Sequence, residues 1–161
     1  MYDCFSSPLQ SERFTTMHQF SFTSKNGTDY FDGVGSLYSR STSQFIANTF
    51  DFTEFNSFFK DTYVEQIYSQ VCEVAENLGV RVGRVRFLRL KAKSCYSLHV
   101  DPDEFRFHIP LKTCRKSFFV VADKIYRMSE VGTLYVLKTT EEHTAVNASF
   151  EDRDHIVFDT Y

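Results

Sequence analysis

The sequence predicts a mainly β protein of the sandwich or jelly-roll type, with one or two helices packed on its sheets. Two observations lead to this fold class. From residue 80 onward the chain reads as short runs of strand composition, separated by turns and by no helical pattern. The chain also contains 18 Phe and 9 Tyr but no Trp, and Phe and Tyr side chains fit the pleated surface of a sheet.

Strand composition recurs in separate segments between residues 84 and 159. The segments are Arg84–Leu90, Ser94–Val100, Phe105–Pro110, Phe118–Ala122, Lys124–Met128, Leu134–Leu137, His143–Ala148 and Asp154–Asp159. In the third, apolar residues alternate strictly with Arg106 and His108, so the two kinds of side chain should occupy opposite faces. The last segment alternates in the same way. The apolar residues expected to be buried together are Phe105, Phe107, Ile109, Ile156 and Phe158.

Residues 1–50 are rich in Ser and Thr, with aromatic residues scattered among them. A disordered tail has fewer aromatics, so we expect only about the first dozen residues to be loose. The Asn26-Gly27 pair follows alternating phenylalanines and precedes two further aromatic residues. This pattern predicts a β-hairpin around an Asn-Gly turn.

Residues 51–79 carry the helical pattern of the chain. Apolar residues recur there at steps of three and four, namely Tyr63, Ile67, Val71, Val74 and Leu78. Asp61 or Thr62 can cap the helix, Glu65 completes a capping box with Thr62, and Gly79 suits the left-handed position after the last turn. The phenylalanines before the helix predict a separate turn or a bent first segment. We expect the helix to pack on the outside of a sheet.

Length and composition favour a single domain, residues 1–161, whose β core is residues 80–161. A net charge of -3 argues against a general nucleic-acid binder. The four cysteines are scattered without a CxxC pair, which predicts reduced thiols rather than a zinc knuckle or a disulfide framework. No apolar run reaches the roughly 18 residues of a membrane span. With no signal-peptide pattern at its start, the chain is expected to be cytoplasmic.

The stretch CYSLHVDPDEFRFHIPL holds the candidate functional residues. His99 and Asp101 are two positions apart, so in an extended strand their side chains point to one face. Two imidazoles and a carboxylate suit a non-haem Fe(II) centre, provided that a third ligand comes from elsewhere. His143 is the candidate for that ligand, and Arg153 follows it by ten residues.

These motifs occur together in a fixed order: HVD, RFHIPL, YRM with a following Gly, HTAVN and DRDHIVFD. In this order they resemble the aspartyl/asparaginyl β-hydroxylase group of 2-oxoglutarate-dependent oxygenases, whose pattern is shared by proline hydroxylases acting on the free amino acid. The resemblance covers roughly residues 84–161. It implies a double-stranded β-helix, the jelly roll of the cupins, and Fe(II) with 2-oxoglutarate as cosubstrate.

The resemblance also implies a role for each of the matching residues. His99, Asp101 and His143 would be the metal ligands, and Asp101 places the chain nearer the proline-hydroxylase side of the group, because some members lack this carboxylate. Arg153 would bind the C5 carboxylate of 2-oxoglutarate, which a planar guanidinium can hold with two parallel hydrogen bonds. The remaining matches are Arg106 and His108, near the substrate or cosubstrate carboxylate, and Asn147, which would fix the turn after the distal histidine.

We therefore expect a dioxygenase that hydroxylates an amino-acid side chain, aspartyl, asparaginyl or prolyl, in a peptide or protein or as the free amino acid. Where relatives commonly have Gly-Glu and Trp, this chain has Gly132-Thr133-Leu134-Tyr135. The main alternative is an inactive jelly-roll module for binding or assembly. A cupin-like isomerase or metal-binding protein without a cosubstrate is a third, disfavoured by Arg106 and Arg153.

Overall fold

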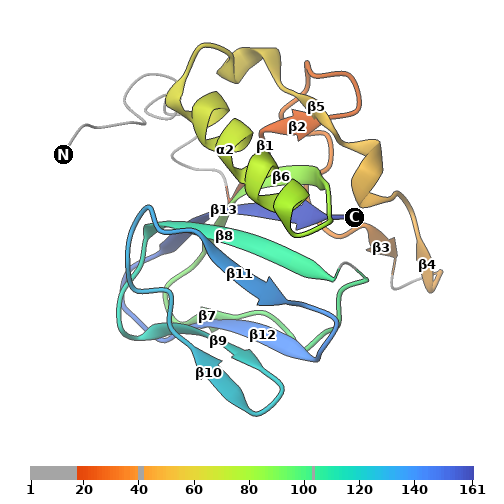
Figure 1. The fold of residues 1–161 in the computed structure, drawn as a ribbon. Coiled ribbons are helices and arrows are strands. Elements are labelled where there is room, and N and C mark those ends of the chain that lie inside the picture. The colour runs from red at the N-terminus through yellow and green to blue at the C-terminus, as the bar shows by residue number, and fades with distance from the viewer. Residues whose placement is uncertain (1–17, 40–41, 103) are drawn as a thin grey trace. The chain divides into compact units, whose positions relative to one another are not determined.

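The computed structural model describes residues 18–39, 42–102 and 104–161 (Figure 1). They form a mainly β structure with one α-helix, as the sequence predicts. The chain divides into two compact units, one extending to Arg86 and including Tyr161, the other running from Phe87 to Thr160. Strand β6 (Val82–Leu90) carries the chain from the first unit into the second. None of the helices described is long and apolar enough to cross a membrane.

The first unit contains short strands, two 3-10 turns and the helix. Its elements are β1 (Gln19–Ser21), β2 (Thr23–Ser24), β3 (Tyr38–Ser39), β4 (Gln44–Phe45), η1 (Thr49–Asp51), β5 (Glu54–Phe55), η2 (Ser57–Phe59), α2 (Tyr63–Asn77) and the start of β6. Of the phenylalanines before the helix, Phe58 and Phe59 lie in a separate turn as expected, whereas Phe55 is in β5. Three rings, those of Phe20, Phe22 and Phe59, pack together with centroids 4.8–6.0 Å apart and are almost completely buried.

The predicted hairpin around Asn26-Gly27 is only partly correct. The turn exists, with Gly27 at φ +68° and the Asn26 side chain accepting a hydrogen bond from the Thr28 amide. However, β2 pairs with β5, about thirty residues further along the chain, rather than with the residues just after the turn. The Asn-Gly turn motif gives no information about a pairing partner so far along the chain. The pattern therefore predicted the wrong strand pairing.

Helix α2 begins and ends where the sequence predicts, but buries a different face. Thr62 is the N-cap and Gly79 adopts φ +77°. The predicted capping box does not form, because the Thr62 side chain makes no cap hydrogen bond and the Glu65 side chain accepts from the Asp61 amide instead. The buried helix residues are Val64, Val71 and Ala75. Of the residues expected on the apolar stripe, Val71 is buried, but Tyr63, Val74 and Leu78 are exposed.

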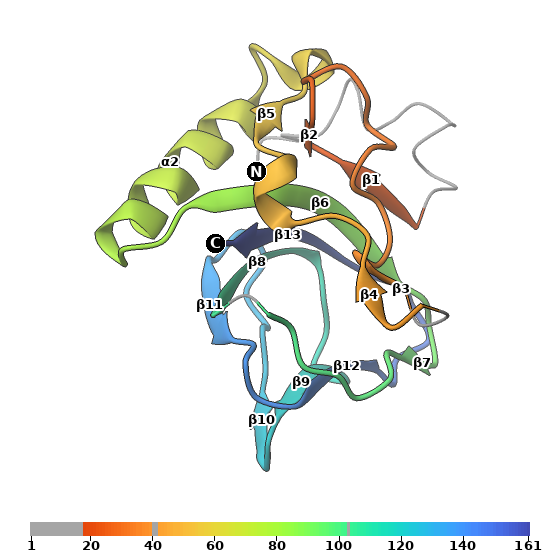
Figure 2. The same cartoon turned by 90° about the vertical axis from the view of Figure 1, so that its right-hand side faces the viewer.

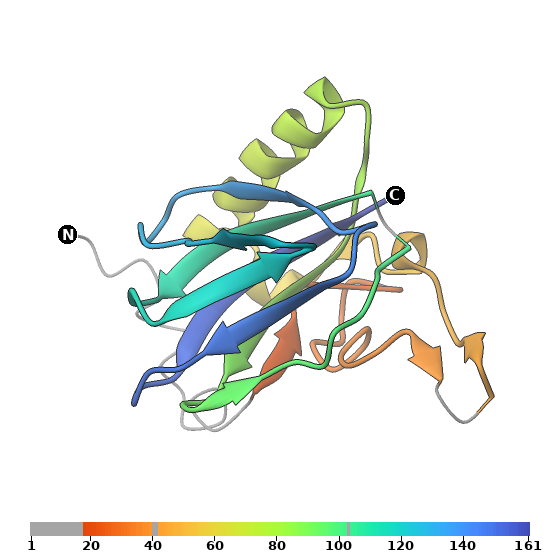
Figure 3. The same cartoon turned by 90° about the horizontal axis from the view of Figure 1, so that it is seen from below.

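The second unit consists of two antiparallel sheets. After the end of β6 it contains β7 (Ser94–Cys95), β8 (Phe105–Lys112), β9 (Ser117–Val121), β10 (Lys124–Tyr126), β11 (Tyr135–Lys138), β12 (His143–Asn147) and β13 (Arg153–Thr160). The strands of this unit in one sheet have the order β6-β13-β8-β11, and the other sheet has the order β10-β9-β12-β7. The sheets form two layers (Figure 2), and β9 and β12 lie side by side in the lower one (Figure 3). Because the chain alternates between the layers, this unit is a double-stranded β-helix.

The pairing of β8 with β13 confirms the predicted alternation. Ile109 lies opposite Ile156 and Phe107 opposite Phe158, and all four are buried. Phe105, expected among them, is only half-buried. On the other face His108 lies opposite Val157 and Arg106 opposite Asp159. Both faces of this sheet are therefore largely covered, and the polar residues share one of them.

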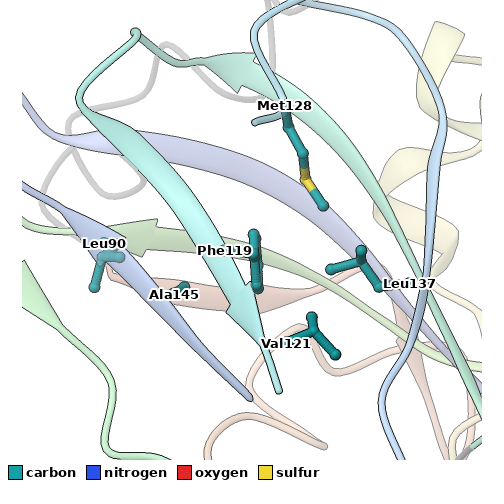
Figure 4. Close-up of a cluster of buried hydrophobic side chains, with 6 residues drawn as sticks. All are labelled: Leu90, Phe119, Val121, Met128, Leu137 and Ala145. Atoms are coloured by element: carbon teal, nitrogen blue, oxygen red, sulfur yellow. The ribbon is translucent and has the colours of Figure 1, made fainter. Parts of the chain in front are cut away.

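Apolar side chains from both sheets fill the space between the layers of the second unit (Figure 4). They are Leu90, Phe119, Val121, Met128, Leu137 and Ala145, with Tyr135 packed against them. Contact among these side chains keeps water away from the polar residues that face the same interior.

Candidate functional site

His99, Asp101 and His143 converge in the second unit, as the sequence predicts. Their ligand atoms all lie within 4.8 Å of one another. The predicted strand Ser94–Val100 is regular only at Ser94–Cys95, but His99 and His143 exchange both backbone hydrogen bonds, at 3.1 and 2.8 Å. The Asp101 amide donates to the carbonyl of Thr139. Backbone hydrogen bonds therefore hold this irregular segment in place at His99 and Asp101, the two positions that carry candidate metal ligands.

Hydrogen bonds fix the orientation of both imidazoles. Nδ1 of His99 lies 2.7 Å from the Ser97 carbonyl oxygen, and Nδ1 of His143 lies 2.9 Å from that of Glu141. A carbonyl only accepts, so each Nδ1 carries a proton, and each Nε2 is the atom that would bind a metal ion once it carries no proton of its own. These Nε2 atoms lie 3.9 and 3.1 Å from Oδ2 of Asp101. This tautomer and convergence suit a divalent metal ion.

The carboxylate of Asp101 is held by Arg106. The Arg106 guanidinium contacts Asp101 through Nη1 and places Nε 2.7 Å from Oδ1 of the buried Asp159. Burial alone would raise the pKa of Asp101, but the hydrogen bond with His143 and the charge of Arg106 outweigh it and lower this pKa. Arg106 therefore faces two protein acids. A largely buried arginine needs an anionic partner, which can be a bound ligand or an acidic side chain of the protein. The partners of Arg106 described here are acidic side chains.

Arg153 is buried without a carboxylate partner among the residues described. It is 4% exposed, its Nη2 lies 3.3 Å from Nδ1 of His155 and 3.8 Å from the sulfur of Met128, and its guanidinium stands over the Phe119 ring. Its Nε makes no hydrogen bond. Burial lowers the pKa of Arg153 to about 10, so the side chain is still charged at neutral pH. An uncompensated buried cation is costly, and an anionic ligand would relieve that cost.

His155 and His108 extend this polar region. Because an arginine can only donate, Nδ1 of His155 accepts, and its Nε2–H is a buried donor without an acceptor. Neither ring nitrogen of His108 has a hydrogen-bond partner, and its ring lies 5.8 Å from that of His155. Burial, followed by the positive charge of Arg153, lowers the pKa of both histidines well below the usual value. Both are therefore neutral.

Asn147 lies outside the ligand cluster, at the end of β12, and is fully buried. Its Nδ2 donates to the carbonyls of Leu90, Lys91 and Glu151, while its Oδ1 accepts from the amide and hydroxyl of Ser149. These bonds fix the turn that connects the strand of His143 to the strand of Arg153. This geometry agrees with the structural role expected for Asn147.

Asp159 was missed by sequence reasoning, and His155 was given no role. The signal was present in part, because residues 153, 155, 157 and 159 share one face of an alternating strand. What the sequence lacks is the register that places Asp159 opposite Arg106.

The two buried neutral histidines predict a loss of stability in acid. The unfolded chain takes up protons below pH about 6.5, whereas folded His108 and His155 do not, so stability present above that pH is lost as the pH falls through it. The expected slope is up to about 1.4 kcal/mol per pH unit for each histidine. Urea unfolding with a chelator between pH 7 and 5 measures it. His155→Leu should flatten the slope, with the exposed His18→Leu as control; equal slopes in both variants would contradict the assignment.

Comparison with known proteins identifies the family. Residues 43–161 match the family described as aspartyl/asparaginyl beta-hydroxylase. The chain belongs to this family. Family membership points to an enzyme of the oxygenase or hydroxylase type, and the match extends the resemblance seen in the sequence motifs toward the N-terminus. A comparison with curated proteins gave no match.

One solved structure supports the fold of this family member. An oxidoreductase of the 2OG-Fe(II) oxygenase family from Burkholderia pseudomallei is similar, with a TM-score of 0.51 and 17% identity over 62% of this chain and 58% of that one. At this identity the similarity shows the fold alone, and this chain matches less than two thirds of that protein. A Bordetella pertussis cupin domain has a TM-score of 0.43, with 13% identity over 51% of this chain and 91% of that one. An RmlC-like cupin with a double-stranded β-helix from Methanocaldococcus jannaschii has 0.41, with 10% identity over 47% and 67%. These two are too distant to support an argument.

Proposed function

We propose that this chain is an Fe(II)- and 2-oxoglutarate-dependent dioxygenase that hydroxylates an amino-acid side chain. The side chain is aspartyl, asparaginyl or prolyl, in a peptide or protein or as the free amino acid. The observation that carries the proposal is Arg153, a buried cation that faces no carboxylate among the residues described.

The surroundings of Arg153 fit a carboxylate ligand. Nε of Arg153 and Nε2–H of His155 are buried donors without acceptors, and they belong to side chains in direct contact. A carboxylate of 2-oxoglutarate would accept from both and would neutralise the guanidinium. The ring nitrogens of neutral His108 offer a further polar contact in the same interior. A ligand with a carboxylate at one end would be oriented by this set.

The donor set of His99, Asp101 and His143 fits Fe(II), because two neutral imidazoles and one carboxylate leave coordination positions open. When bound, the iron supplies the redox chemistry that couples oxygen to oxidation of the cosubstrate and of a C–H bond. The protein holds the ligand atoms in place through the backbone bridge, the two Nδ1 hydrogen bonds and the Arg106 contact. The apolar cluster between the sheets limits the access of water.

The substrate would approach from the His99 side. The His99 side chain is 35% exposed, whereas that of His143 is 3% exposed. Leu98 and Val100, on either side of His99, are each 58% exposed. At this segment the proposed metal ligands are therefore open to solvent and lie next to exposed apolar side chains. This supports the entry of a substrate side chain there.

The decisive experiment measures 2-oxoglutarate binding to the iron-loaded protein. Arg153→Ala should weaken it by about 2–5 kcal/mol, the usual cost of losing one partner of a desolvated charge pair. Arg153→Lys should recover only part of the loss, because an ammonium cannot make the forked contact. Fe(II) affinity should change little in either variant, and the exposed Arg81→Ala serves as control.

Succinate production without added substrate provides a second readout. Wild-type protein should form succinate slowly from 2-oxoglutarate, and Arg153→Ala should form far less. If iron-loaded wild type neither binds 2-oxoglutarate nor turns it over, the oxygenase proposal fails. The alternative, an inactive jelly-roll module for binding or assembly, would then replace it.

A further inference from the structure

Four cations gather at one end of the second unit, and we call them the basic end: Lys93, Arg115, Lys116 and Arg127. Lys93 and Lys116 place their ammonium groups 3.9 and 5.8 Å from the ring centre of Phe150. Arg127 donates to the carbonyl of Arg115 at 2.8 Å, and Arg115 precedes Lys116 in the chain. The four residues therefore form one continuous surface.

The four cations of the basic end have no acidic partner among the residues described, in contrast to three other cations of this unit. Arg89 forms a two-pronged pair with Asp154, while Lys91 pairs with Asp152 and Lys112 with Glu151. No such pair is formed by the four residues of the basic end. Their charge remains uncompensated on a chain whose net charge is -3.

An exposed aromatic ring stands within this surface. Phe150 is 80% exposed, more than the other large apolar residues described. It lies on the turn that Asn147 and Ser149 hold by buried hydrogen bonds. A ring held in solvent by a rigid turn is organised for contact with another molecule.

A cavity of about 430 Å³ is lined by Arg115 and Arg127 of the basic end and by Ser129. All three side chains are hydrogen-bond donors, and two are guanidiniums that match a carboxylate with paired N–H groups. Such a cavity accepts an acidic group.

From these observations we infer that the basic end binds an acidic segment of a polypeptide, with carboxylates on Arg115 and Arg127 and an apolar side chain on Phe150. A nucleic acid fits less well. Stacked bases need free aromatic faces, but Lys93 covers one face of Phe150 and Arg127 stands over Phe118 at 5.5 Å. The inference does not depend on the proposed oxygenase activity.

Fluorescence anisotropy with labelled poly-L-glutamate and iron-free protein tests the inference. The double variant Arg115→Gln/Arg127→Gln should bind about tenfold more weakly than wild type, which corresponds to two exposed ion pairs. Lys91→Gln/Lys112→Gln is the matched control: it changes the net charge equally but removes lysines that already have acidic partners. Equal losses in both double variants would overturn the inference, because binding would then follow net charge alone.

Two further probes test the partner and the ring. A glutamate–tyrosine copolymer should bind wild type more tightly than poly-L-glutamate, and Phe150→Ala should remove that advantage. Single-stranded oligo-dT should bind more weakly than either polypeptide at the same salt concentration. Tighter binding of oligo-dT, or no advantage of the copolymer, would overturn the assignment of an acidic polypeptide with an apolar contact.

Discussion

Replacing His143 by alanine should lower the affinity for Fe(II) by more than about a hundredfold. The side chain is almost fully buried and its Nε2 faces Oδ2 of Asp101 at 3.1 Å, so its loss removes one of three proposed ligands, and the described residues offer no fourth ligand in this group. Loss of residues that merely orient ligands already costs about 10–100-fold. Anaerobic titration with Fe(II), followed by measurement of succinate formation, checks both binding and activity.

His99→Ala should act in the same direction, while the exposed His18→Ala should bind Fe(II) as wild type does. His108→Phe provides a second control, because the unpartnered His108 is assigned to the ligand-contacting interior rather than to the metal. Wild-type affinity in both His99→Ala and His143→Ala would remove the proposed metal site.

Phe107→Ala should destabilise the protein by about 3–5 kcal/mol. The ring is 0% exposed and lies opposite Phe158 on the apolar face of β8, so truncation leaves a cavity that the surrounding sheet can only partly fill. Urea unfolding monitored by circular dichroism gives the difference in the free energy of unfolding.

Phe150→Ala is the matched control for this measurement, because the same truncation at an 80% exposed ring should change stability by less than about 0.5 kcal/mol. A loss below about 1 kcal/mol for Phe107→Ala would show that the face assigned to β8 does not form the packed core.

The parts of the structure predicted from sequence are those with a local signal. Strict alternation in Phe105–Lys112 determines which side chains share a face, and the strand follows from it. The spacing of His99 and Asp101 places them together for the same reason, although the segment between them and β7 is irregular. The assignment of His143 depended on the resemblance of the ordered motifs to a family, not on geometry.

What could not be predicted depends on partners far apart in the chain. The salt bridge between Arg106 and Asp159 requires the register of β8 against β13, which no local pattern specifies. The buried face of α2 was misjudged because helical spacing identifies several overlapping stripes, and packing selects the one with Val64, Val71 and Ala75.

The backbone bridge between His99 and His143 has a consequence for the order of folding. These residues are 44 positions apart in the chain (143 minus 99), and their side chains meet only after that loop has closed and β12 has joined the sheet. Loop closure of this length is an entropic barrier that precedes the contacts it permits. A nascent or partly folded chain therefore lacks the proposed metal site, and uptake of the proposed iron would follow completion of the sheet.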